Sequence, residues 1–276
     1  GNGAASVASY AARFGLKSVI LVPDSTPEEK IKQSLTYGSQ VIKVKGPYSN
    51  CFNLALKMSQ EGNLYNLTTT FLNPYTVEGD KAVSFEIHDQ MEQWPDYVIV
   101  PIGSGPLLVG IYKGFKEINK IFKLGRKIPR MIGVQASGCS PISKAYQKGA
   151  SHVFPEKNPK TIAGGIGDGL NGYSEDGTYT LSVIRESNGV CIDVSDEEII
   201  TAQNMLAEYE GLFVEPSAAA ALAAVRNSTI KEIISDQSIL LILTGHGLKD
   251  MNSVVQNSNG IPCIEPNVEQ LSKLIS

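Results

Sequence analysis

The stretch "DYVIVPIGSGPLLVG", residues 96–110, indicates the fold class of the chain. Residues 97–101 form a run of β-branched and aromatic side chains, which is typical of a buried strand. The turn Gly103-Ser104-Gly105 follows, and a helical pattern begins at Leu107. A strand that passes through a glycine turn into a helix predicts a parallel sheet covered by helices.

The rest of the chain repeats this alternation of strands and helices. Strands are predicted at residues 17–23, 40–45, 64–68, 96–102, 131–136 and 238–244. Helices are predicted at residues 2–14, 26–38, 50–62, 76–91, 107–118, 195–211 and 215–227. We therefore expect an α/β protein with a smaller domain of residues 1–80 and a larger domain of residues 81–276.

Composition narrows the classes of partner. The chain has 276 residues, of which 42% are hydrophobic, and a net charge of −4, so nothing favours nucleic acid or an anionic membrane surface as a partner. No apolar run reaches the length of a membrane span, and the three histidines lack metal-ligand spacing. The four cysteines lack paired spacing, which favours reduced, mostly buried thiols in the cytoplasm.

Three glycine-bearing segments follow predicted strands, where ligands of parallel sheets bind. The turn at residues 103–105 could present N–H groups and a hydroxyl to a phosphate, or be a tight turn only. In "LILTGHGLKD", Thr244 ends a strand and aims its hydroxyl at the same edge. The loop "TIAGGIGDGLNG", residues 161–172, suits either a wrap around a ligand or a flexible linker.

Two helix starts add polar side chains to these turns. In "GNGAAS", Asn2 is a good N-cap, and the flanking glycines allow close approach of another group. In "EPSAAAALAAV", Glu215 stands at a helix N-terminus, where it would either stabilise the helix dipole or contact a ligand in the cleft.

In order, these motifs are the Gly-Asn helix start, "GSGPL", "EPSAAAA" and "LTGHGLKD". Over essentially the whole chain this series resembles the pyridoxal-phosphate enzymes of the tryptophan synthase β-chain fold, and among them the threonine synthases. The resemblance implies pyridoxal 5'-phosphate as cofactor. It also implies cofactor contacts, which are the ring hydroxyl for Asn2, the phosphate for Gly103, Ser104, Gly105 and Leu107, the pyridine nitrogen for Thr244, and the cofactor cleft for Glu215.

The implied activity is elimination or replacement on an amino-acid side chain, with O-phosphohomoserine as the expected small-molecule substrate. Threonine synthases commonly carry an arginine for the substrate phosphate where this chain has Thr76, and Lys81 is the expected replacement. Because of this departure, a threonine or serine ammonia-lyase stays open as an alternative, as does a non-catalytic ligand-binding homologue. The resemblance also implies a homodimer.

In this family a lysine before the Gly-Asn helix start forms a Schiff base with the cofactor. No lysine of residues 1–276 stands at that place, so we expect the lysine in a segment outside this chain, one that also supplies the N-terminal part of the larger domain.

This expectation is tested by mixing the chain with pyridoxal phosphate, reducing with borohydride and mapping modified lysines. Residues 1–276 alone should show no stoichiometric labelling of a single lysine and no turnover. Labelling of one lysine together with turnover would contradict the expectation.

Overall fold

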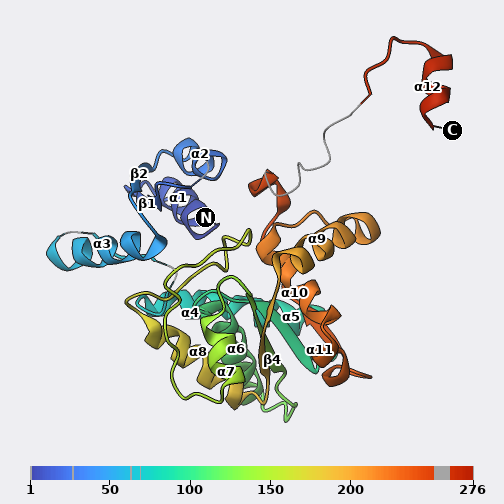
Figure 1. Cartoon of the computed structure of the whole chain (residues 1–276). Helices are drawn as coiled ribbons and strands as arrows, with labels where there is room; N and C mark the ends of the chain where they lie inside the picture. The colour runs from blue at the N-terminus through green and yellow to red at the C-terminus, as the bar shows by residue number, and fades with distance from the viewer. Residues whose placement is uncertain (1, 27, 63, 69, 252–261, 276) are drawn as a thin grey trace.

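The computed structural model describes residues 2–26, 28–62, 64–68, 70–251 and 262–275 and has two parallel sheets flanked by helices (Figure 1). The smaller sheet pairs β1 (Val19–Pro23) with β2 (Gln40–Val44). The larger sheet has the order β5-β4-β3-β6, in which β3 is Tyr97–Pro101, β4 Arg130–Ala136, β5 Val190–Val194 and β6 Ile239–Leu241. The predicted α/β class is confirmed.

The smaller sheet packs against three helices from the first part of the chain. These are α1 (Asn2–Arg13), α2 (Glu28–Thr36) and α3 (Tyr48–Glu61). Ile20 and Val22 of β1 are buried with Ile31 of α2. The strand predicted at residues 64–68 is wrong, because that segment is irregular and its leucines and tyrosine are exposed, with no sheet face on which to bury them.

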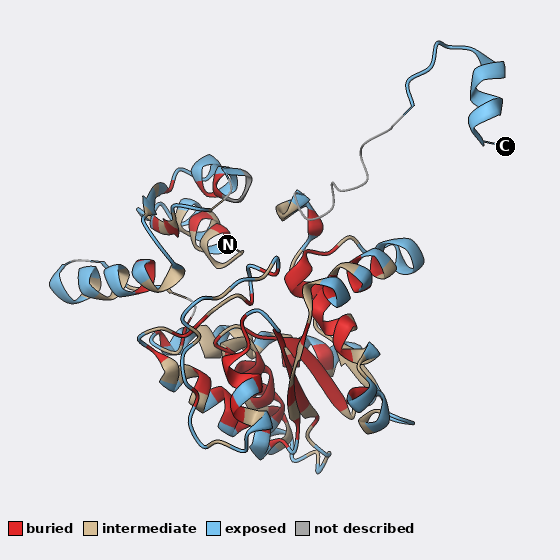
Figure 2. Ribbon diagram, viewed as in Figure 1, coloured by how far each residue is buried: buried red, intermediate tan, exposed pale blue. Residues whose placement is uncertain are grey.

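Both faces of the larger sheet are covered. Val98 and Val100 of β3 join the core formed with α6 (Pro106–Ile121) and α8 (Ser174–Glu186). Tyr97 and Ile99 point the other way, into the core formed with α9 (Asp196–Glu210), α10 (Pro216–Arg226) and α11 (Ser228–Ile233). Figure 2 shows buried residues concentrated in these strands and on the helix faces that pack on them. This two-sided burial explains the unbroken apolar run of β3.

Several elements differ from the sequence-based prediction in length, number or presence. The last strand ends at Leu241 rather than at residue 244, and the helix predicted over 76–91 is two helices, α4 (Pro74–Asp80) and α5 (Ala82–Gln90). Sequence reasoning missed α7 (Pro141–Gln147), α8, α11 and β5. The sequence of α8 includes Gly177 and two threonines, which have low helix propensity, so packing on the sheet stabilises this helix.

Helices α4 and α5 approach α6 closely at two glycines of α6, which fixes the position of α6. A Cβ at Gly110 would lie 2.5 Å from Cβ of Asp80 in α4, and one at Gly114 would lie 1.8 Å from Oγ of Ser84 in α5. Burial of Asp80 at this contact raises the pKa of its carboxyl to about 6. Residues 74–90 therefore pack directly on α6, while the division into domains 1–80 and 81–276 stays a prediction.

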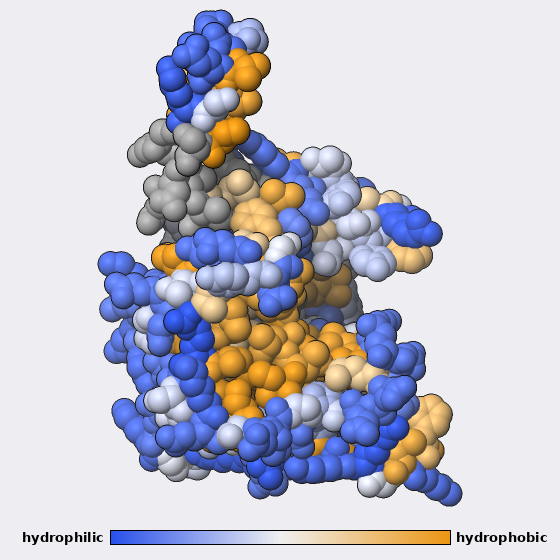
Figure 3. Space-filling view, turned by 90° about the vertical axis from the view of Figure 1, so that its right-hand side faces the viewer, coloured by the Kyte–Doolittle hydropathy of each residue, from blue (hydrophilic) through white to orange (hydrophobic). Residues whose placement is uncertain are grey.

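Apolar side chains also gather on one side of the surface, which Figure 3 shows. The edge strand β6 is half-buried along its length, and the short helices η1 (Gly247–Lys249) and α12 (Val268–Ile275) follow it in the chain. Helix α12 has no buried residue.

The four cysteines are free thiols, of which Cys51, Cys139 and Cys191 are buried and Cys263 is exposed. In the described ranges no helix is long and apolar enough to cross a membrane.

The α6 contacts predict opposite effects for two glycine-to-alanine changes in helices. Gly114→Ala should lower the free energy of unfolding by about 1–3 kcal/mol, because the methyl group meets Ser84. Gly79→Ala in α4 is the matched control and should raise it by about 0.5–1 kcal/mol, since its Cβ would have no atom within 4 Å. Urea unfolding measures both, and equal effects would contradict this account of the helix packing.

Candidate active site

Asn2 and Glu215, which are far apart in the sequence, meet at the carboxyl edge of the larger sheet. Asn2 begins α1, and Glu215 is the residue before α10. The Asn2 side-chain Nδ2 donates a hydrogen bond of 2.7 Å to Oε1 of Glu215. Glu215 is buried, with 6% of its surface exposed. Glu215 therefore orients the Asn2 amide rather than capping α10, since it makes no side-chain cap hydrogen bond.

The segment after β6 is held against the same pair. The backbone N–H of Glu215 donates to the carbonyl of Gly245 at 3.0 Å, and Val214 forms an antiparallel bridge with His246. A Cβ at Gly245 would lie 2.0 Å from Oε1 of Glu215 and 2.8 Å from Nδ2 of Asn2. A side chain at position 245 would therefore have to displace the Glu215 carboxyl and the Asn2 amide, and Thr244, the residue before it, is exposed.

The turn between β3 and α6 is also specified by its neighbours. Gly105 has φ +102°, and a Cβ there would lie 2.3 Å from Cγ2 of Thr180. The Thr180 hydroxyl donates to the carbonyl of Ser104 at 2.6 Å, which fixes the turn from α8. Pro106, the first residue of α6, has no N–H, but the backbone N–H groups of Leu107 and Leu108 have no partner within the helix and could donate to an anion.

Leu107 contributes differently from the glycines. Its side chain is half-buried and packs against the core under α6. A leucine side chain has no donor, so only its backbone N–H, in the first turn of α6, is suited to an anion.

The glycine-rich loop at residues 161–172 lies against both groups of residues. The N–H of Gly165 donates to Oγ of Ser217, two residues after Glu215, at 2.9 Å. Farther along, Cβ of Asp168 lies 3.2 Å from where Gly103 would carry a Cβ. The loop therefore lies beside the turn and the Asn2–Glu215 pair, which favours the ligand-wrapping interpretation over a linker.

Asp168 is a residue that sequence reasoning missed. Oδ1 accepts from the Tyr173 hydroxyl at 2.6 Å and from the N–H of Leu170 at 3.0 Å. Burial raises the pKa of the Asp168 carboxyl, and these two hydrogen bonds partly offset the rise. A single acidic residue inside a glycine-rich run was the signal that could have revealed it.

The structure does not bring Lys81 to this site. Its Nζ lies 2.6 Å from Glu117 of α6 and 2.5 Å from Glu78 of α4, so its charge is already paired. Glu117 lies about three helical turns from the start of α6, which places Lys81 away from the Gly103 turn. Thr76 lies half-buried in α4, with its backbone N–H donating to the carbonyl of Asn73. The expected replacement of the arginine by Lys81 is therefore not supported by its position.

The contact of Gly245 with Glu215 and Asn2 predicts the effect of adding a methyl group at position 245. Gly245→Ala should displace the Glu215 carboxyl and misorient the Asn2 amide, and weaken binding of pyridoxine 5'-phosphate about tenfold or more. Gly79→Ala, whose Cβ meets no atom, is the control and should bind as the unmodified chain does. Isothermal titration measures both, and unchanged affinity in Gly245→Ala would contradict the proposed role of this contact.

Known proteins are similar in sequence to this chain over all of the residues described for the site. The family described as "Pyridoxal-phosphate dependent enzyme" matches residues 1–245. Threonine synthase of Methanocaldococcus jannaschii is 38% identical over 100% of the chain, and that of Methanosarcina acetivorans is 36% identical over 100%. The chain covers 67% of the length of each.

Solved structures share the fold. Maize serine racemase superposes with a TM-score of 0.75 at 25% identity, over 92% of this chain and 72% of that one. The processed form of threonine deaminase isoform 2 from Solanum lycopersicum superposes with a TM-score of 0.72 at 22% identity, over 92% of this chain and 70% of that one. Because this family model matches residues 1–245, which include every residue described for the site, the chain belongs to the family of pyridoxal-phosphate-dependent enzymes.

Proposed function

We propose that the chain is most of the catalytic core of a threonine synthase, which converts O-phosphohomoserine to threonine and phosphate. The observation that carries this proposal is the hydrogen bond between Asn2 and Glu215, two residues that the resemblance assigned to one cofactor. Curated threonine synthases that align over the whole chain support the choice of reaction.

When bound, pyridoxal phosphate supplies an electron sink for a carbanion at the substrate α-carbon. The Asn2 amide, held by Glu215, would donate to the ring hydroxyl. The Gly103–Gly105 turn and the backbone N–H groups of Leu107 and Leu108 would hold the phosphate. The Thr244 hydroxyl would face the pyridine nitrogen, and because it carries no charge it would not hold a proton there.

A threonine or serine ammonia-lyase is the second candidate, and position 76 favours it. A buried dianionic phosphate requires charge-assisted donors, for which arginine is suited by its two parallel N–H groups. Thr76 cannot supply such donors, and Lys81 is paired with Glu78 and Glu117. An ammonia-lyase acts on a hydroxyl-bearing substrate and needs no second phosphate site.

The proposal includes a homodimer in the cytoplasm.

A non-catalytic homologue is the third candidate. Expression of the protein from the start of its reading frame, followed by analysis of its products, distinguishes the three candidates. Threonine and phosphate from O-phosphohomoserine support the synthase. A 2-oxo acid from threonine or serine supports the lyase, and binding of the cofactor without turnover supports the homologue.

Position 76 predicts the outcome of a substitution in that protein. Thr76→Arg should raise kcat/KM for O-phosphohomoserine about tenfold to a hundredfold, because one charged hydrogen bond to the phosphate is gained. The kcat/KM for serine should not rise. Thr36→Arg, on the exposed face of α2, is the matched control for added charge.

If the unmodified enzyme strongly prefers O-phosphohomoserine and Thr76→Arg leaves that preference unchanged, the role given to position 76 is wrong. The threonine synthase assignment would then stand on the products alone.

A further inference from the structure

Gln135, near the end of β4, is a fully buried polar residue that the site described above does not include. Buried amides are costly unless their hydrogen bonds are made, so the partners of Gln135 are informative. Its Nε2 donates to the carbonyl of Gly103 at 3.2 Å. Its Oε1 accepts from the backbone N–H groups of Ile142 at 2.8 Å and Ser143 at 3.0 Å.

We propose that Gln135 is a positioning residue for the cofactor phosphate, which acts by holding the Gly103 turn through its side-chain amide. The proposal rests on the assignment of residues 103–107 as the phosphate-binding turn. The donor side of the amide orients the Gly103 peptide, and the acceptor side is fixed at the start of α7. A rigid anchor on each side leaves the turn little freedom to rotate its N–H groups away from the phosphate.

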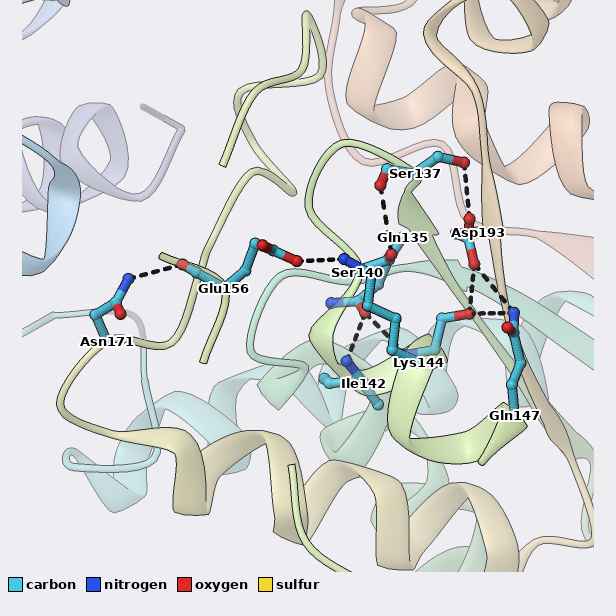
Figure 4. Close-up of polar contacts among 10 residues, drawn as sticks. Gln135, Ser137, Ser140, Ile142, Lys144, Gln147, Glu156, Asn171 and Asp193 are labelled. Carbon is cyan, nitrogen blue, oxygen red and sulfur yellow. Dashed lines mark hydrogen bonds and ion pairs between the residues drawn. The ribbon is translucent and has the colours of Figure 1, made fainter. Parts of the chain in front are cut away.

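The start of α7 depends on the same side chain. Ser140, the N-cap residue of α7, makes no side-chain cap hydrogen bond. Gln135 instead accepts from two N–H groups of the first turn, as a distant cap would. Figure 4 shows Gln135 between this helix start and the network around Asp193.

Asp193 of β5 holds the other side of the segment that joins β4 to α7. Its Oδ2 accepts from the Ser137 hydroxyl at 2.7 Å, and Oδ1 accepts from Ser143 at 2.8 Å and from Gln147 at 3.1 Å (Figure 4). Asp193 pairs in register with Gln135 across the two strands. Two adjacent strands therefore fix residues 137–143, and Gln135 alone extends this fixed segment to the Gly103 carbonyl among the described hydrogen bonds.

The experiment compares ligands that differ only in the phosphate. Pyridoxine 5'-phosphate and pyridoxine carry no aldehyde, so neither can react with a lysine. In Gln135→Met, which has a similar volume without the amide, affinity for pyridoxine 5'-phosphate should fall about three- to tenfold, while affinity for pyridoxine stays within about twofold. A residue with a general structural role would lower both affinities together.

Two further variants make the result specific. Gln147→Met removes an amide from the same network that does not touch the Gly103 turn, and its affinity ratio should stay unchanged. Gln135→Glu keeps two oxygens for the α7 N–H groups but has no N–H for Gly103. It should therefore lose phosphate preference as the pH rises and the carboxyl ionises, because a carboxylate has no proton to donate to the Gly103 carbonyl.

Each outcome of the titrations decides a separate point. Unchanged preference for the phosphate in both Gln135 variants overturns the positioning role. Absence of any phosphate preference in the unmodified chain overturns the assignment of the turn itself. Neither result depends on which amino acid the enzyme converts, so failure of the proposed reaction is distinguished from failure of this inference.

Discussion

Parallel pairing of β3 with β4 and β6 is the constraint on which the site depends. Because parallel strands run in one direction, the segments that follow them leave the sheet at one edge. The Gly103 turn follows β3, the Gln135 segment ends β4, and Thr244 and Gly245 follow β6. Strand pairing by itself therefore brings groups that are distant in sequence to the same edge of the sheet.

Contacts between these segments then turn proximity into defined geometry. A buried carboxylate is unfavourable unless hydrogen bonded, and Asn2 supplies a donor to Glu215. The same contact occupies the place of a Cβ at position 245, so a side chain there would displace the Glu215 carboxyl. The beginning of α1, the beginning of α10 and the segment after β6 therefore adopt their positions together, which is why three separate motifs describe one site.

The helices beneath the site set where the turn lies. Gly110 and Gly114 allow α4 and α5 to approach α6 closely, and Thr180 of α8 holds the Ser104 carbonyl. The beginning of α6 is thereby fixed from below by helix packing and from the side by Gln135. An anion site built from backbone N–H groups needs this support, because its donors have no side-chain freedom with which to adjust.

The α/β class and the strand β3 with its glycine turn were determined by the sequence by itself, because they depend on local patterns such as the apolar run of residues 97–101 and the glycines at 103 and 105. The candidate residues of the cofactor cleft are what the resemblance to a known family implies. The motifs at Asn2, Glu215 and Thr244 were also recognisable, because each stands at a helix start or strand end with a residue type suited to one contact. Their resemblance to a known family implies that they contact one cofactor.

Only the tertiary structure decided what touches what. Lys81 could be predicted as a phosphate ligand from its sequence distance to Thr76, but its charge is paired with glutamates of α4 and α6. Asp168 and Gln135 carried no periodic or spacing signal, and their partners lie on other elements. The helix α8 and the irregular segment 64–68 were mispredicted for the same reason: burial against distant parts of the chain, or its absence, outweighs local propensity.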